Sequence, residues 1–129
     1  MAKNNRIFIS FAIEDVFYRN GLVNQAKDER TPFEFVDMSV KEPWEDSWKT
    51  RCRTKIKGCD GVIALISTNT ETASGARWEI KCAAAEDIPI IGVHIYKDWT
   101  KRYTPPELSG HQTIDWSWDG ISSFINGLP

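Results

Sequence analysis

The chain has 129 residues, 41% of them apolar and 26% charged, and its formal net charge is −2. This length and composition predict one globular domain spanning residues 1–129. Acidic and basic residues are interspersed, which argues against nucleic acid or an anionic membrane as a partner.

The opening "MAKNNRIFIS" enters a strand-like run without the apolar core of a signal peptide, and no apolar run reaches the length of a membrane span. We therefore expect a cytoplasmic protein. Cys52, Cys59 and Cys82 have no CxxC spacing and no paired histidines nearby. This pattern predicts reduced packing cysteines, with no disulfide framework and no metal site.

Strand-like and helix-like segments alternate along the chain. Strands are expected at Arg6–Ser10, Phe33–Asp37, Val62–Ser67, Ile88–Tyr96 and Thr113–Asp115. Helices are expected at Glu14–Glu29, at about Trp44–Ile56, around Glu79 after the loop that ends near Ser74, and at Asp119–Leu128. A further helix is expected between the fourth and fifth strands. This order predicts an α/β fold, a flavodoxin-like, doubly wound three-layer sandwich with a mostly parallel sheet in the strand order 2-1-3-4-5.

Two of the expected helices carry informative apolar rows. Trp44, Trp48 and Cys52 recur every four residues, with Ile56 continuing the row, so they form one stripe. A stripe of this kind favours core packing over a ligand platform, although Trp44, at the helix start, could overhang a pocket.

On the helix around Glu79, Ile80 and several alanines share the face that must pack on the sheet. Glu79 lies about a quarter turn away, since successive residues differ by ~100°, and we expect it to be partly buried and to reach a cleft. Trp78 and Cys82 fall on the opposite side. That second apolar stripe needs a cover, either another segment of this chain or another subunit.

In doubly wound sheets, ligands bind beyond the carboxyl ends of the strands. This rule selects a set of residues at those ends and in the loops that follow them: Ser10, Phe11, Glu14, Asp15, Asp37, Trp44, Ser67, Thr68 and His94. Taken singly, such residues most often satisfy loop and cap backbone groups. Their convergence at one edge of the sheet favours a site.

Several chemistries lack their sequence signature. There is no GxSxG nucleophile elbow, and "SFAIED" after the first strand contains no glycine for a phosphate-binding turn. A phosphoryl-accepting receiver would need an aspartate where Ser67 stands and a lysine after "TID", so that reading survives on fold analogy alone.

Three segments together resemble the TIR-like family that includes the NAD-processing subunit of Thoeris antiphage systems. They are "RIFISFAIEDVFYRNGL", "FVDMSVKEPWEDSWKTRCRTKIKGCDGVIALIS" and "GARWEIKCAAAEDIPIIGVHI", which cover about the first hundred residues. The opening strand followed by Ser-Phe and Glu-Asp, and the "WEI" helix before an Ile-rich strand, are the most specific parts. The resemblance implies a single TIR-like domain.

The resemblance also implies an activity. Active TIR domains cleave the nicotinamide–ribose bond of NAD+ with one glutamate on the helix before the fourth strand, which here is Glu79. NAD+ is then the substrate and no cofactor is implied. Ser10 and Phe11 would line the nicotinamide and ribose pocket, and Asp37, Trp44 and Trp48 would border the adenine or loop side.

In Thoeris-like members the ADP-ribosyl group becomes a cyclic ADP-ribose isomer or an ADP-ribosyl conjugate that activates a separate effector. The resemblance further implies assembly into a homo-oligomer on activation, with Trp78 and Cys82 as interface candidates, and a phage-derived trigger. The alternative is a catalytically silent TIR-like module that works by homotypic or partner binding. The loop after the second strand is short and lacks the usual proline-containing surface of animal TIR adaptors, which argues against adaptor-type binding.

Overall fold

The computed structural model describes residues 5–29, 33–38, 41–95 and 104–129. Five strands form one sheet in the order β2-β1-β3-β4-β5, and every neighbouring pair is parallel. The strands are β1 (Arg6–Ser10), β2 (Glu34–Val36), β3 (Gly61–Ile66), β4 (Ile90–His94) and β5 (Gln112–Asp115). The predicted strand order is confirmed, and among the described strands the sheet is wholly parallel.

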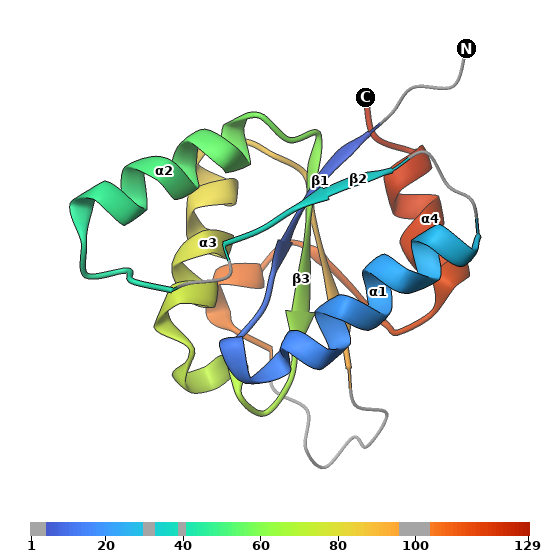
Figure 1. The fold of residues 1–129 in the computed structure, drawn as a ribbon, viewed down its shortest axis with the longest axis horizontal. Helices are drawn as coiled ribbons and strands as arrows, with labels where there is room; N and C mark the ends of the chain where they lie inside the picture. The colour runs from blue at the N-terminus through green and yellow to red at the C-terminus, as the bar shows by residue number, and fades with distance from the viewer. Residues whose placement is uncertain (1–4, 30–32, 39–40, 96–103) are drawn as a thin grey trace.

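Helices cover both faces of the sheet, as Figure 1 shows, with α2 and α3 on one side and α1 and α4 on the other. Their bounds are α1 (Val16–Asp28), α2 (Asp46–Lys57), α3 (Ser74–Ala85) and α4 (Trp118–Asn126). Short 3-10 turns, η1 (Ile13–Asp15) and η2 (Thr70–Thr72), lead into α1 and α3. These layers are the predicted three-layer sandwich.

The helix expected between the fourth and fifth strands is not found in the part of that connection that the structure describes. Residues 104–111 contain only the 3-10 turn η4 (Pro106–Leu108), while residues 96–103 lie outside the described residues. The pair Pro105 and Pro106, at the start of this turn, disfavours a regular helix across it, because proline lacks the amide proton that a helix interior needs.

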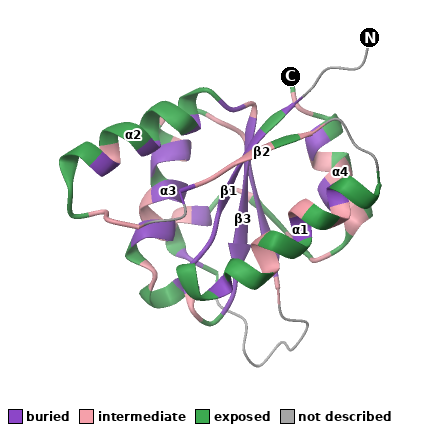
Figure 2. Cartoon of the chain, viewed as in Figure 1, coloured by how far each residue is buried: buried purple, intermediate pink, exposed green. Residues whose placement is uncertain are grey.

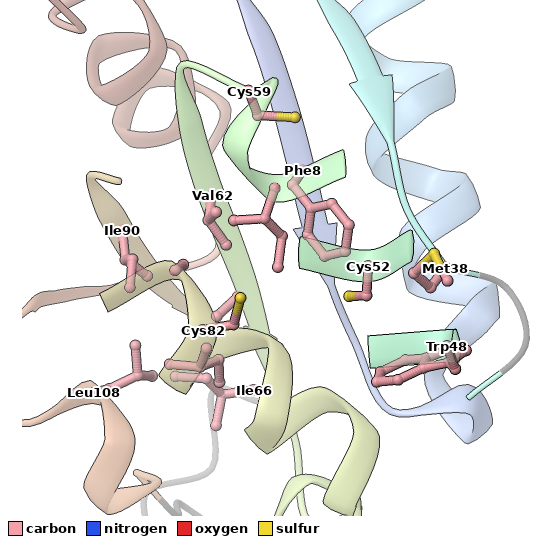
Figure 3. Packing of buried hydrophobic residues seen from close by; sticks show 14 residues of the cluster. Phe8, Met38, Trp48, Cys52, Cys59, Val62, Ile66, Cys82, Ile90 and Leu108 are labelled. Carbon is pink, nitrogen blue, oxygen red and sulfur yellow. The ribbon is translucent and has the colours of Figure 1, made fainter. Parts of the chain in front are cut away.

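Successive side chains of each strand point to opposite faces of the sheet, which divides the core into two clusters. Phe8 and Val62 point toward α2 and α3, whereas Ile7 and Ile63 point toward α1 and α4. Figure 2 shows the central strands of the sheet buried between helices whose outer faces are exposed, while the edge strand β2 is only partly buried. Figure 3 shows the cluster beneath α2 and α3, in which Trp48 and Cys52 lie close to Phe8. Parallel strands buried on both faces explain the continuous apolar runs of β3 and β4.

The expected stripe on α2 holds for three of its four members. Trp48, Cys52 and Ile56 are buried, but Trp44 is 72% exposed and precedes the helix, which begins at Asp46. The prediction that Trp44 continues this row was therefore wrong. The four-residue spacing keeps side chains on one face only where the backbone is already helical.

All three cysteines are free and buried, as predicted. Cys52 and Cys82 belong to the cluster beneath α2 and α3, and Cys59 joins it near the end of α2. Among the described residues, no helix is long and apolar enough to cross a lipid bilayer.

The two tryptophans of the expected stripe offer a matched pair of substitutions. Trp48 is 1% exposed and its ring lies 5.4 Å from that of Trp78 in an edge-to-face arrangement. We expect Trp48→Ala to lower the free energy of unfolding by about 3–5 kcal/mol, because it leaves a large cavity. The exposed Trp44→Ala should change it by less than ~0.5 kcal/mol. Denaturant melts measure both values, and equal losses would contradict this assignment of core and surface.

Candidate active site

Glu79 lies in the middle of α3, on the flank of the helix that meets the sheet near the carboxyl end of β1. Glu79 is 0% exposed, so the expectation of a partly buried side chain that reaches a cleft was wrong. A fully buried carboxylate is rare unless a cation or several donors compensate its lost hydration. The surroundings of Glu79 supply both kinds of partner.

Two side chains from other segments bind the carboxylate. Lys41 Nζ lies 2.8 Å from Glu79 Oε2 and 3.0 Å from Oε1, so the ammonium contacts both oxygens. Ser10, the last residue of β1, places its Oγ 3.1 Å from Oε1 and 3.0 Å from the carbonyl oxygen of Ala76. The single hydroxyl proton of Ser10 is therefore shared between two acceptors. Cys52 Sγ lies 3.9 Å from Oε2 on the α2 side.

The Lys41 side chain is enclosed along its length. Its ammonium lies 4.3 Å from the centre of the Phe11 ring, within the range of a cation–π contact. Its stem passes over Gly75 at the start of α3, where an added Cβ would come within 2.8 Å of Lys41 Cβ. Only a residue without a side chain leaves this path open. The side chain of Lys41 is 10% exposed.

Burial sets the ionisation of Glu79. Loss of hydration raises its pKa from 4.5 to about 7, although the charge and hydrogen bonds of Lys41 and the hydrogen bond of Ser10 act in the opposite direction. The negative charge of Asp37 adds to the upward shift. The carboxylate is thus poised near neutral pH, where either protonation state is within reach.

Asp37, expected beside the adenine, already has a cation. Its Oδ2 lies 2.6 Å from both Nε and an Nη of Arg19 on α1, and its side chain is 8% exposed. Lys55 Nζ donates to its backbone carbonyl oxygen at 3.2 Å. These contacts fasten the segment after β2 to α1 and α2. Asp37 therefore shapes the position of the following loop, in which Lys41 lies.

A second buried carboxylate joins two loops at the same edge of the sheet. Asp15 is 1% exposed; Ser67 Oγ donates to its Oδ2, and Asn69 Nδ2 donates to its Oδ1 at 2.9 Å. Ser67 also accepts from the Asn69 backbone N–H at 3.0 Å. Ser67, directly after β3, and Asp15, in η1, act as loop anchors, as isolated serines and aspartates in loops often do. They hold the turn that leads into α3.

The other expected site residues are more dispersed. Phe11 is 1% exposed and reaches the site through the face of its ring, while Trp48 is enclosed between α2 and the sheet. Trp44 lies on the surface before α2. The structure thus brings Ser10, Phe11 and Glu79 together, while Trp48 belongs to the core cluster and Trp44 lies on the surface.

The apolar stripe of α3 is covered by α2 of the same chain, one of the two covers that its sequence allows. Cys82 is 3% exposed, and Trp78 packs its edge against Trp48. Trp78 still borders two surface hollows of about 530 and 250 Å³, which Arg53 also lines. An interface role for Trp78 and Cys82 stays a prediction.

Lys41 is the site residue that sequence reasoning missed. It stands in the polar loop "MSVKEP", 38 positions from Glu79, and no periodicity connects the two. The signal that could have found it is Gly75, because a glycine at the first turn of a helix indicates a close approach by another segment. Such a signal identifies a close neighbour without saying which residue it is.

Comparisons with solved structures agree with this architecture. The TIR domain of a Toll-related receptor from Hydra magnipapillata superposes with a TM-score of 0.63 at 17% identity, over 92% of this chain and 90% of that one. A Clostridium botulinum CMP N-glycosidase gives 0.53 at 18% identity, over 93% and 94%. A prokaryotic SEFIR domain gives 0.52 at 11% identity, over 94% and 87%. These identities are low, so the likenesses concern the fold.

No curated protein matches the chain. The family model for the TIR-like domain of Thoeris protein ThsB matches residues 8–100. That range includes β1 from Phe8 onward, all of β2, β3 and β4, and the site residues Ser10, Lys41 and Glu79. The five-stranded parallel sheet, its strand order and this match together place the chain in the Thoeris ThsB TIR-like domain family.

Proposed function

We propose that the chain cleaves the bond between nicotinamide and ribose in NAD+, with Glu79 as the catalytic residue. The observation that carries this proposal is a single carboxylate, buried at the ligand-binding edge of the sheet and held by Ser10 and Lys41. The ADP-ribosyl product would be a cyclic isomer or a conjugate that signals to a separate effector. We expect homo-oligomerisation on activation and a phage-derived trigger.

The chemistry needs little more than an anchored anion. Nicotinamide leaves as a neutral pyridine, so no general acid has to protonate it. Positive charge develops on the ribose ring, as in other glycoside cleavages. A carboxylate in a site that excludes water stabilises this charge more strongly than a hydrated one, because the local dielectric is low. Ser10 would orient Glu79, and its donation to Oε1 would keep one oxygen in place.

One structural neighbour carries out related chemistry on the same fold. The Clostridium botulinum protein is a CMP N-glycosidase, so this architecture supports cleavage of an N-glycosidic bond in at least one protein. The likeness supports the reaction class alone, since fold similarity does not determine substrate.

One observation favours the alternative, a silent interaction module. Glu79 is 0% exposed and ion-paired, which is also how a purely structural carboxylate looks. The alternative predicts that Glu79 supports folding only, and that no substitution at this position changes the rate of nicotinamide release from NAD+.

Replacement of Glu79 by glutamine separates the two functions. Glu79→Gln keeps the shape of the side chain and removes its charge, so we expect nicotinamide release from NAD+ to fall by at least ~100-fold while the protein stays folded. Mass spectrometry of the reaction mixture measures nicotinamide and the second product together. Circular dichroism checks the fold.

The matched control is Glu71→Gln, which makes the same change at an exposed position just before α3. It should leave nicotinamide release unchanged. If Glu79→Gln turned over NAD+ at the rate of the unaltered protein under activating conditions, the catalytic assignment would be lost.

The raised pKa of Glu79 predicts the pH dependence of the reaction. The carboxylate is the active form, and its pKa of about 7 is above the ordinary value because burial disfavours the charge. We therefore expect kcat/KM to rise with pH through about 7. The charged and titratable groups facing Glu79 are Lys41, Asp37 and Cys52. Lys41→Met should move the midpoint upward, since the ammonium lowers the pKa. A rate independent of pH between ~5 and ~8 would contradict this role.

A further inference from the structure

The position of the Lys41 ammonium has the features of a site for an organic cation. Both carboxylate oxygens of Glu79 lie within 3.0 Å of Nζ, and the Phe11 ring lies 4.3 Å away. An anion combined with an aromatic face is the arrangement that proteins use to recognise quaternary nitrogen groups. Here a side chain of the same chain holds that position.

A ligand cannot touch Glu79 while Lys41 remains in place. The carboxylate has no exposed surface, and the Lys41 ammonium contacts both of its oxygens. Lys41 comes from a segment outside the helices and strands, between β2 and α2. A lysine in such a segment can return its compact ammonium to water at low cost. Departure of the Lys41 ammonium costs free energy, because it leaves Glu79 as a buried and unpaired charge.

We propose that Lys41 is a specificity-determining residue of this site, whose ammonium holds the cation position until a ligand places its own positive charge there. The inference rests on the proposed function to the extent that the pyridinium of NAD+ is such a charge. A cationic ligand exchanges one cation for another beside Glu79. A neutral ligand of the same shape leaves the carboxylate unpaired, so the site selects against it.

The same exchange gives the reaction a direction. When the bond between ribose C1′ and the pyridinium nitrogen breaks, its electron pair goes to the nitrogen, nicotinamide leaves neutral, and the positive charge stays on the ribose. An oxygen or nitrogen nucleophile, water or the hydroxyl or amine of an acceptor, then bonds to C1′ and loses its proton to bulk water, so that Glu79 ends the step as an anion. No cation is left in the site, so Lys41 can return to Glu79 and favour release of the product.

The test compares two small probes, N1-methylnicotinamide, a permanent cation, and nicotinamide, its neutral analogue. Each is titrated into the full chain by NMR, and neither has a ribose bond to cleave. Lys41→Met keeps the stem of the side chain and removes its charge. At a pH well above the Glu79 pKa of about 7, where the carboxylate is charged in the variant as well, we expect Lys41→Met to bind the cation about tenfold more tightly. Its affinity for nicotinamide should change little. Glu79→Gln should lose the preference for the cation.

Two further variants guard the interpretation. Lys27→Met removes the same charge from the exposed face of α1 and should bind both probes as the unaltered chain does. Gly75→Ala keeps every charge but crowds the Lys41 stem, so it should tighten cation binding in the same direction as Lys41→Met. This second route remains open if Lys41→Met fails to fold.

The inference is overturned if folded Lys41→Met, or Gly75→Ala in its place, binds the cation no better than the unaltered chain does. It is also overturned if both probes gain equally, because Lys41 would then act only as a steric plug. Failure of the proposed function would give a different result from failure of this inference. In that case the cation would bind as described, yet NAD+ would release no nicotinamide.

Discussion

The burial of one carboxylate constrains the whole edge of the sheet. Glu79 has no contact with solvent, so its charge must be balanced by groups that the fold brings to it. The balance explains why β1 ends in a serine and why the first turn of α3 contains a glycine beneath the Lys41 stem. It also explains why the loop after β2 is fastened by Asp37 to Arg19. Each of these features places a partner of Glu79.

Most of the architecture follows from local pattern. Runs buried on both faces predict central parallel strands, and the alternation of strand with helix leads to one sheet order. The sequence interpretation was wrong where the apolar spacing continues beyond the N-terminal end of the helix. Trp44 has the spacing of Trp48 and Cys52, but the helix begins two residues later and leaves it exposed. Periodicity reports which residues would share a face and not where the helix starts.

The site was predictable only in part, for a physical reason. Ser10 and Glu79 were identified by strand ends and family resemblance, and the structure brings them within 3.1 Å of each other. The ion pair with Lys41 joins segments 38 positions apart. A contact of this kind depends on how a loop folds back over a helix, and loops carry no repeating pattern that would reveal it. The complete burial of Glu79 was missed for the same reason, because its partners Lys41 and Ser10 come from segments distant in the sequence.

The ion pair of Lys41 and Glu79 fits either a structural or a catalytic site, and its placement favours the second. A pair that serves only stability can be replaced by apolar residues at little cost, since burying two charges offsets most of their attraction. Such a pair gains nothing from lying at the ligand-binding edge of the sheet, or from drawing its cation from a segment outside the helices and strands. Both features are useful if the cation must leave and return. An ammonium held against a carboxylate and an aromatic ring lowers the pKa of Glu79 toward its ordinary value. Under the proposed exchange, the contact that closes the site would therefore also favour the charged carboxylate that a cationic ligand needs.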